Sequence, residues 1–150
     1  AASDVYKRQP IHLAIKKNNL EMTSFLTESG AHPIEPAPIS DAELAAADLE
    51  TGRIAAIGCS QCHIVEKGTA PSGQHNHGPP LIGIFGREIA AVEGFPYSSA
   101  LADISGIWNV EELNRFITDP AGRIPGTNME LMPKLTDVER VALIAYLGGL

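Results

Sequence analysis

The feature that most constrains this chain is a pair of cysteines followed at once by a histidine, in Cys59-Ser60-Gln61-Cys62-His63. The chain has no other cysteine. A small secreted domain stabilised by disulfides would carry more of them. Hydrophobic residues make up 44% of the 150 residues, which is enough for one compact domain of ordinary size. The spacing of the cysteines therefore calls for a chemical explanation.

The pattern Cys-x-x-Cys-His is typical of covalent haem attachment. At the end of a helix, two cysteines three positions apart face the same way and can form thioethers to one porphyrin. The adjacent His63 can then point its imidazole at the iron. A thioether sulfur is a suitable sixth ligand, and Met129 follows the rigid Pro-Gly pair of Pro125-Gly126-Thr127-Asn128-Met129. Met132 is a rival ligand, and a lone methionine is more often an ordinary core or surface side chain.

Two other chemistries remain open at this point. A zinc site could combine Cys59 and Cys62 with His75 and His77, although zinc-finger histidines are usually spaced further apart and the chain has no second cysteine pair. A thioredoxin-like redox pair would need a parallel βαβ context, which the sequence does not show.

Capping patterns predict an all-α fold for the larger part of the chain. Ser40-Asp41-Ala42-Glu43 opens a helix that runs, with a possible break, towards Ile57. A second helix begins at Asn109 and ends before Pro120, with Leu113, Phe116 and Ile117 on one face. The last begins at Thr136, is expected to bury Val138, Val141, Ala142 and Ala145, and ends at Gly148-Gly149. The long Gly- and Pro-rich loops between these helices show no strand alternation and need a central group such as a haem to pack against.

The first 39 residues predict three further segments. Residues 4–9 match one reading frame of a transposase adapter used in sequencing libraries, so we interpret residues 1–9 as an artefact and exclude them from the fold. Residues 10–32 resemble one ankyrin repeat, a helical hairpin that would be the last of a truncated array. Residues 33–39 contain three prolines and are expected to be a linker to a domain at 40–150.

From about Asp48 to Leu150 the chain resembles the class I cytochromes c, of the mitochondrial and bacterial c2-like type. The resemblance rests on several motifs in the right order: Cys59–Gly68, Gly78-Pro79-Pro80-Leu81, Phe85-Gly86-Arg87, Gly94-Phe95-Pro96-Tyr97-Ser98, Trp108, Pro125–Met129 and Leu143–Leu147.

The resemblance implies a cytochrome c fold around one covalent haem c, with His63 and Met129 as the axial ligands of the iron. The carbonyl group of Pro79 would accept a hydrogen bond from the ring of His63. The resemblance also implies that Arg87, Tyr97, Trp108 and Thr127 bind the haem propionates; for Trp108 the alternative is core packing, and the two roles are compatible. Phe116 departs from the family, which usually has a tyrosine that meets the methionine sulfur.

An iron with six ligands has no open position, which indicates an electron carrier and not an enzyme. If Met129 dissociated, a peroxidase-like enzyme would be the alternative, and a second alternative is an ankyrin-based binding module with a haem tether or sensor. The expected partners are redox proteins, a reductase or an oxidase. Docking through a lysine ring is not expected, because Gly58, Ala121, Gly122 and Asn128 stand where the family has lysines.

The net charge of −7 lies entirely in residues 37–150, which argues against nucleic acid as a partner. No apolar stretch is long enough to span a membrane, and the N-terminus has no signal-peptide pattern. The resemblance nevertheless implies export to the periplasm, where bacteria attach haem c, so a signal sequence is expected to have been lost by truncation.

Overall fold

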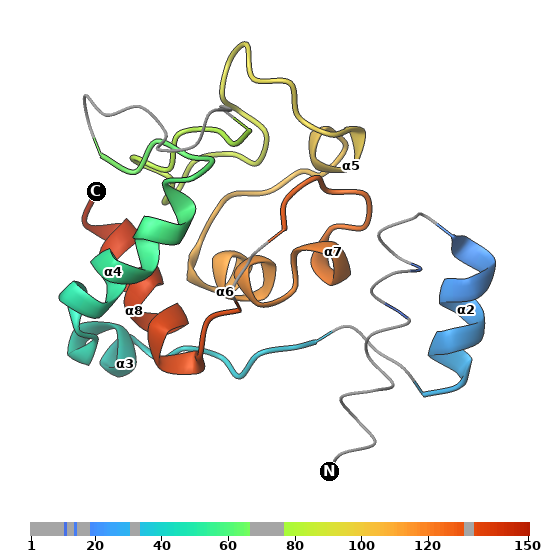
Figure 1. The fold of residues 1–150 in the computed structure, drawn as a ribbon, viewed down its shortest axis with the longest axis horizontal. Helices are drawn as coiled ribbons and strands as arrows, with labels where there is room; N and C mark the ends of the chain where they lie inside the picture. Colours follow the sequence, from blue (N-terminus) through green and yellow to red (C-terminus); the bar gives the residue numbers. More distant parts are fainter. Residues whose placement is uncertain (1–10, 12–13, 15–18, 31–33, 67–76, 131–133) are drawn as a thin grey trace.

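The computed structural model describes residues 11, 14, 19–30, 34–66, 77–130 and 134–150 (Figure 1). Within these residues the regular secondary structure is helical, and long loops connect the helices. The one β-type feature among them is an isolated antiparallel bridge between Glu88 and Ile107. The predicted all-α class is therefore confirmed for the described residues. The helices are α2 (Leu20–Glu28), α3 (Asp41–Ala46), α4 (Leu49–Cys59), α5 (Ser99–Ala102), α6 (Val110–Thr118), α7 (Pro120–Arg123) and α8 (Asp137–Gly148).

The predicted helix starts are confirmed, because the capping side chains make the expected bonds. Ser40 forms a complete capping box with Glu43 at the start of α3. The helix predicted to run towards Ile57 is broken at Ala47, and Asp48 caps α4, which reaches Cys59. Asn109 caps α6, whose last residue lies before Asp119 as expected.

Helix α8 begins at its Thr136–Glu139 capping box, and its buried face agrees with the prediction only in part. Ala142 is buried as predicted and Val141 and Ala145 are half-buried, but Val138 is 74% exposed. The buried residues also include Arg140, Leu143 and Leu147, which the predicted stripe did not contain. Packing against the neighbouring helices α3, α4 and α6 decides which of the apolar positions of α8 are buried.

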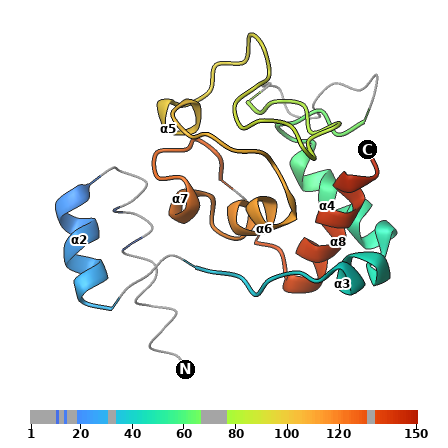
Figure 2. The ribbon, with the colours of Figure 1, turned by 180° about the vertical axis from the view of Figure 1, so that it is seen from behind.

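Helices α4 and α8 pack side by side along their length (Figures 1 and 2). Gly52 makes this close approach possible, because a β-carbon at that position would overlap the backbone of Ala142. Helices α6 and α3 also pack on α8, and α7 packs on α6. The main core lies among these helices and the loop residues that pack on them, and it consists of Ala56, Val65, Leu81, Ile84, Ile89, Trp108, Leu113, Phe116, Ile117, Ile124, Leu143, Ile144 and Leu147.

The two short helices α5 and α7 were not predicted. Each has four residues and begins at a side-chain cap, Ser98 for α5 and Asp119 for α7. Pro120 ends α6 as expected, and it also occupies the first turn of α7, where a missing N–H costs nothing.

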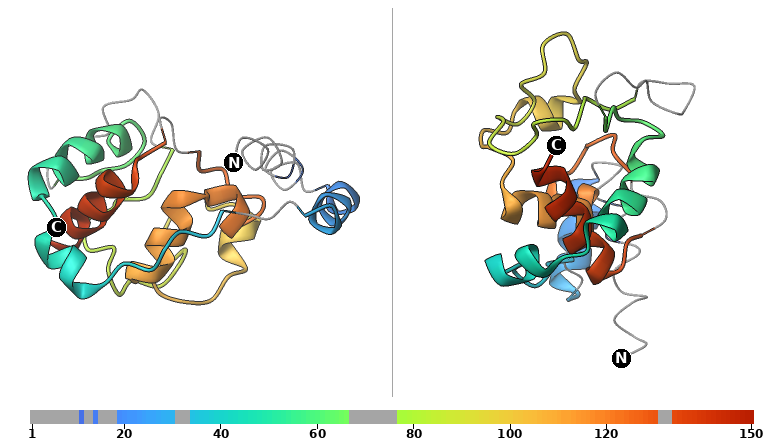
Figure 3. Two further views of the ribbon diagram at one scale, coloured as in Figure 1. Left: turned by 90° about the horizontal axis from the view of Figure 1, so that it is seen from below. Right: turned by 90° about the vertical axis from the view of Figure 1, so that its left-hand side faces the viewer.

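Helix α2 stands at the edge of the molecule, away from α4 and α8 (Figure 3). Its residue Leu26 packs against the buried Ile11, and this pair forms a cluster separate from the main core. Gly30 follows the helix with a positive φ of 85°, the left-handed conformation in which glycine commonly ends a helix. Residues 1–10, with the predicted adapter scar, lie outside the described residues. Within the described residues, no helix has the length and apolar character needed to cross a membrane.

Candidate functional site

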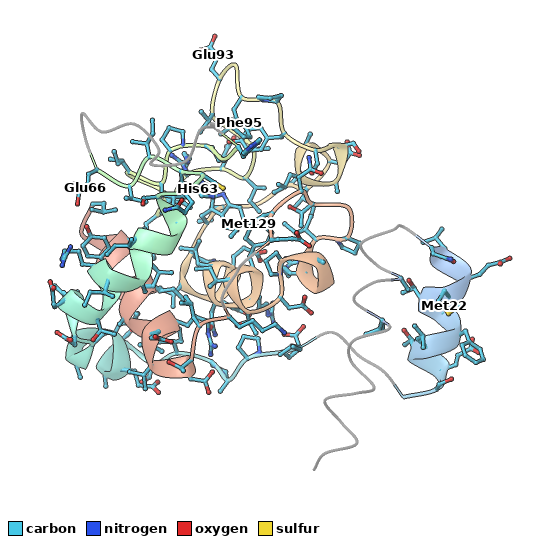
Figure 4. The ribbon with its side chains drawn as sticks, in the orientation of Figure 1. Met22, His63, Glu66, Glu93, Phe95 and Met129 are labelled. Atoms are coloured by element: carbon cyan, nitrogen blue, oxygen red, sulfur yellow. The ribbon has the colours of Figure 1, made fainter. Side chains whose placement is uncertain are left out.

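The two cysteines, His63 and Met129 line one cavity. Met129 lies 66 positions further along the chain than His63, and Figure 4 labels both side chains, which lie near each other in that view. The cavity has a volume of about 200 Å³. Most of its wall is apolar and comes from α5, α6, α8 and the loops between α4 and α6: Pro79, Leu81, Ile84, Phe95, Pro96, Leu101, Leu113, Phe116, Ile117, Leu143 and Leu147. The fold thus brings together thiols, an imidazole and a thioether on the walls of a mostly apolar cavity.

The cysteine motif continues α4 as a turn. The backbone N–H groups of Cys62 and His63 both donate to the carbonyl oxygen of Cys59, at 3.0 and 2.9 Å. This turn places both thiols and the imidazole on the cavity wall. Burial raises the pKa of the Cys59 thiol to about 11. A thiol with so high a pKa is protonated at neutral pH and is a poor nucleophile, which weakens the thioredoxin-like alternative.

The ring of His63 is held by a hydrogen bond to the loop residue Pro79. Its Nδ1 lies 2.7 Å from the carbonyl oxygen of Pro79. Because a carbonyl only accepts, Nδ1 carries the proton and Nε2 of the neutral ring keeps its lone pair. Burial is the main cause that lowers the pKa of His63, and it favours this neutral form. The ring is therefore prepared to bind a metal through Nε2.

Gly78 leaves the room that the His63 ring occupies. A β-carbon at Gly78 would overlap Cε1, Nδ1 and Nε2 of the ring. The backbone N–H of Gly78 also donates to the carbonyl oxygen of Cys62 at 3.0 Å, which fastens this loop to the cysteine motif. The sequence identified the Gly-Pro-Pro-Leu motif but assigned a role only to Pro79, so this packing role of Gly78 was missed.

Met129 reaches the cavity from the loop after α7. Thr127 is buried, and its Oγ1 accepts a hydrogen bond from the backbone N–H of Met129 at 3.3 Å. The Thr127 hydroxyl group keeps its own hydrogen for another acceptor. The rival ligand Met132 lies outside the described residues, as does His75 of the zinc alternative. His77 is exposed at the cavity wall.

Three of the four residues predicted to bind propionates line the cavity, namely Tyr97, Trp108 and Thr127. Arg87 is absent from the described lining. Its guanidinium group donates to the carbonyl oxygens of Pro80 at 2.7 Å and Ile82 at 3.3 Å. The structure therefore shows Arg87 as a brace of the loop next to Pro79.

The sequence also missed part of the wall. Ser98 and Asn128 contribute polar groups, and both belong to motifs that were recognised without a role for these residues. Leu143 and Leu147 are four positions apart on α8 and could have been found from that spacing. Leu101 on α5 had no such signal, because a four-residue helix is too short to show periodicity.

These residues fit a haem. An apolar cavity suits the macrocycle, and the thiols, the imidazole and the thioether are the groups that attach haem c and ligate its iron. Hydroxyl, amide and indole groups on the same wall can donate hydrogen bonds to carboxylates. The donor set is therefore complete among the described residues.

Comparisons with known proteins point to one family. The family model described as "Cytochrome c" matches residues 50–150. A "Cytochrome c homolog" of Bradyrhizobium diazoefficiens is 39% identical over 124 residues, which cover 82% of this chain and 65% of that protein. A "Cytochrome c" of Chlamydomonas reinhardtii is 38% identical over 107 residues, covering 71% of this chain and 92% of that protein. A "Cytochrome c2" of Rhodoplanes tepidamans is 36% identical over 101 residues, covering 67% and 91% respectively.

Proposed function

This chain belongs to the cytochrome c family, and we propose that it is an electron-transfer protein in which His63 and Met129 are the axial ligands of one haem iron. The family binds haem c covalently through two cysteines, and Cys59 and Cys62 are the only cysteines of this chain. The observation that carries the proposal is the cavity whose wall includes both thiols, the imidazole and the thioether.

When bound, the haem supplies one-electron exchange between ferric and ferrous iron. The residues of the chain keep the ligands in place during this exchange. Pro79 fixes the tautomer of His63, and the apolar walls keep water from the iron. If His63 and Met129 both bind the iron, no position would be open for oxygen or peroxide, so the proposed role is that of a carrier and not of an enzyme.

Polar groups on the cavity wall support a role in binding the propionates. Tyr97, Trp108 and Thr127 can each donate a hydrogen bond to a carboxylate, which makes a buried carboxylate tolerable. The hydroxyl oxygen of Tyr97 also accepts from the backbone N–H of Val92 at 3.3 Å, which orients the ring. Arg87 donates to the backbone carbonyls of Pro80 and Ile82, which supports a role in holding the loop beside the cavity and not a direct bond to a propionate.

The proposed partners are redox proteins, and the charge of the chain limits how they dock. Gly58 and Asn128 line the cavity where lysines of the family would stand, and the chain carries a net charge of −7. Attraction to an acidic partner is therefore absent, and a neutral or basic docking surface fits better. We place the protein in the periplasm, where covalent attachment of haem occurs in bacteria.

We further propose that residues 10–32 form an ankyrin-like hairpin apart from a cytochrome c domain at 40–150. The separate packing of Ile11 with Leu26 supports this division. A hairpin of this kind needs neighbouring repeats to bury its faces, and the side chains of Leu20 and Phe25 are 73% and 62% exposed.

Co-expression with a haem c maturation system tests the proposal. We expect a denaturing gel stained for haem to show a coloured band at the size of the polypeptide. The Cys59→Ala, Cys62→Ala double variant should give no coloured band, because thioether bonds alone survive denaturation. A colourless band for the unmodified protein would overturn the proposal.

A further inference from the structure

The segment before α3 is fastened to α6 and α7 by three polar contacts. The backbone N–H of Ile34 donates to Oδ2 of Asp119 at 3.2 Å. Glu35 forms an ion pair with Arg115 at 3.3 Å. The carbonyl oxygen of Ala37 accepts a hydrogen bond from Nδ2 of Asn114 at 2.9 Å. The sequence predicted a linker here, and the contacts show that residues 34–37 lie along the surface of the helices.

Asp119 joins this segment to α7. Its side chain is buried, with 6% of the residue exposed. Oδ2 accepts from Ile34, while Oδ1 accepts from the backbone N–H of Gly122 at 3.0 Å and so caps α7. Its carbonyl oxygen accepts from the N–H of Arg123 at 2.8 Å. A buried carboxylate needs such donors, so the cap and the segment stabilise the same group.

A short series of bonds leads from α7 to Met129. The N–H of Ile124, a fully buried residue, donates to the carbonyl oxygen of Pro120 at 2.9 Å. The N–H of Thr127 donates to the carbonyl oxygen of Ile124 at 3.1 Å, and Thr127 Oγ1 accepts from Met129 at 3.3 Å. The position of Met129 in the cavity therefore depends on the turn that Asp119 caps.

We propose that Asp119 is a positioning residue for Met129, and that the Ile34 amide supports it in this role. The chain before α3 thereby acts on the stability of the bond between Met129 and the iron. This inference rests on the proposed function, since it presumes that Met129 is an iron ligand.

External imidazole measures the effect directly. Imidazole can bind ferric iron only when Met129 has left it, so its apparent affinity is proportional to the fraction of molecules with an open loop. Loss of one buried hydrogen bond should raise that fraction about three- to tenfold. We expect this rise in Ile34→Pro, which removes the amide hydrogen, and in Asp119→Asn, where Oδ1 can still cap α7. The reduction potential should fall in both, because thioether ligation stabilises ferrous iron.

The control is Glu50→Gln on α4, which removes one negative charge as Asp119→Asn does but breaks only an exposed ion pair with Arg53. Its imidazole affinity should equal that of the unmodified protein. The double variant of Ile34 and Asp119 should bind imidazole no more tightly than the stronger single variant, because both changes remove the same bond. An unchanged affinity in Ile34→Pro would overturn the inference.

Hydrogen exchange on the unmodified holoprotein gives a second test that needs no variant. If Ile34→Pro does not fold, this experiment by itself tests the inference. The amide hydrogens of Ile34, Gly122 and Thr127 should be protected and should exchange in one common opening. An Ile34 amide that exchanges at the rate of an unprotected peptide would overturn the inference. Failure of the proposed function would look different, because the unmodified protein would then lack covalent haem or the weak long-wavelength band of methionine ligation.

Discussion

Pro79 accepts a hydrogen bond from His63, with the carbonyl oxygen and Nδ1 2.7 Å apart. This bond makes the cysteine motif and the downstream proline loop one structural unit. The unit is closed by two backbone bonds, from Gly78 to Cys62 at 3.0 Å and from Leu81 to Ile64 at 2.9 Å. The direction of Nε2 is thus set before any ligand binds, which is the preorganisation that a ligand of iron requires.

Gly78→Ala should disturb this unit. The new methyl group would overlap the His63 ring, so the ring or the loop must move. We expect a loss of about 1 to 3 kcal/mol in the free energy of unfolding, the usual cost of overpacking. Denaturant titration of the holoprotein measures this loss.

Gly148→Ala is the matched control for that substitution. Gly148 lies in α8 outside the described lining of the cavity, and a β-carbon there would meet only the ring of Phe85, at an ordinary contact distance of 3.7 Å. Alanine should therefore leave stability unchanged or raise it by up to about 1 kcal/mol. Equal effects of the two substitutions would contradict the assigned role of Gly78.

Phe116→Tyr should change the reduction potential. Phe116 is buried on the cavity wall, where its ring lies 5.1 Å from that of Trp108. A hydroxyl group there is expected to donate to the sulfur of Met129, because the surrounding wall is apolar. Phe85→Tyr is the control, since Phe85 does not contribute to the described lining of the cavity. A redox titration that finds the same potential for Phe116→Tyr and the unmodified protein would refute the hypothesis.

Asn114→Ala should be strongly destabilising. Asn114 Oδ1 accepts from Nε of the buried Arg140 at 2.8 Å, and Nδ2 donates to Ala37 at 2.9 Å. Removing the amide leaves a buried donor of the charged Arg140 side chain unsatisfied, at a cost of roughly 2 to 4 kcal/mol. Asp137→Asn should cost less than about 1 kcal/mol, because that partner of Arg140 has a side chain that is 89% exposed. Thermal unfolding that ranks the two variants in the opposite order would contradict this account.

Glu139 should contribute to the loss of stability in acid. Bonds from the backbone and side chain of Thr136 hold the pKa of Glu139 below its ordinary value. A carboxyl group with a lowered folded pKa stabilises the protein above its unfolded pKa, and this contribution is lost as the pH falls through the folded pKa. The difference in unfolding free energy between the unmodified protein and Glu139→Gln should therefore shrink as the pH is lowered from neutral. A difference that stays constant would show that the capping carboxylate has no such role.

Short sequence motifs were sufficient to predict much of the fold and of the candidate site. The capping residues Ser40, Asn109 and Thr136 predicted three helix starts, because a cap is a property of a few adjacent residues. The cysteine motif and the Pro-Gly loop before Met129 predicted which side chains meet in the cavity. These motifs are specific because covalent attachment and ligation permit few arrangements.

Tertiary contacts explain what the sequence did not predict. Arg140 is buried on α8 because Asn114 and Asp137 satisfy its donors, and Asn114 is 26 positions away. The prolines around residues 33–39 indicated an extended segment but not its bond to Asp119, since a single backbone amide has no sequence signature. The boundary between the two predicted domains stays a prediction.

Nuclear magnetic resonance of the ferrous holoprotein tests the central claim most directly. The chain has three methionines, Met22, Met129 and Met132, which can be labelled at their methyl carbons. The ring current of the porphyrin shifts the methyl resonance of an iron-bound methionine far upfield. We predict one such resonance, which disappears in Met129→Leu and remains in Met132→Leu. An upfield methyl resonance that persists in Met129→Leu, or none in the unmodified protein, would contradict the account.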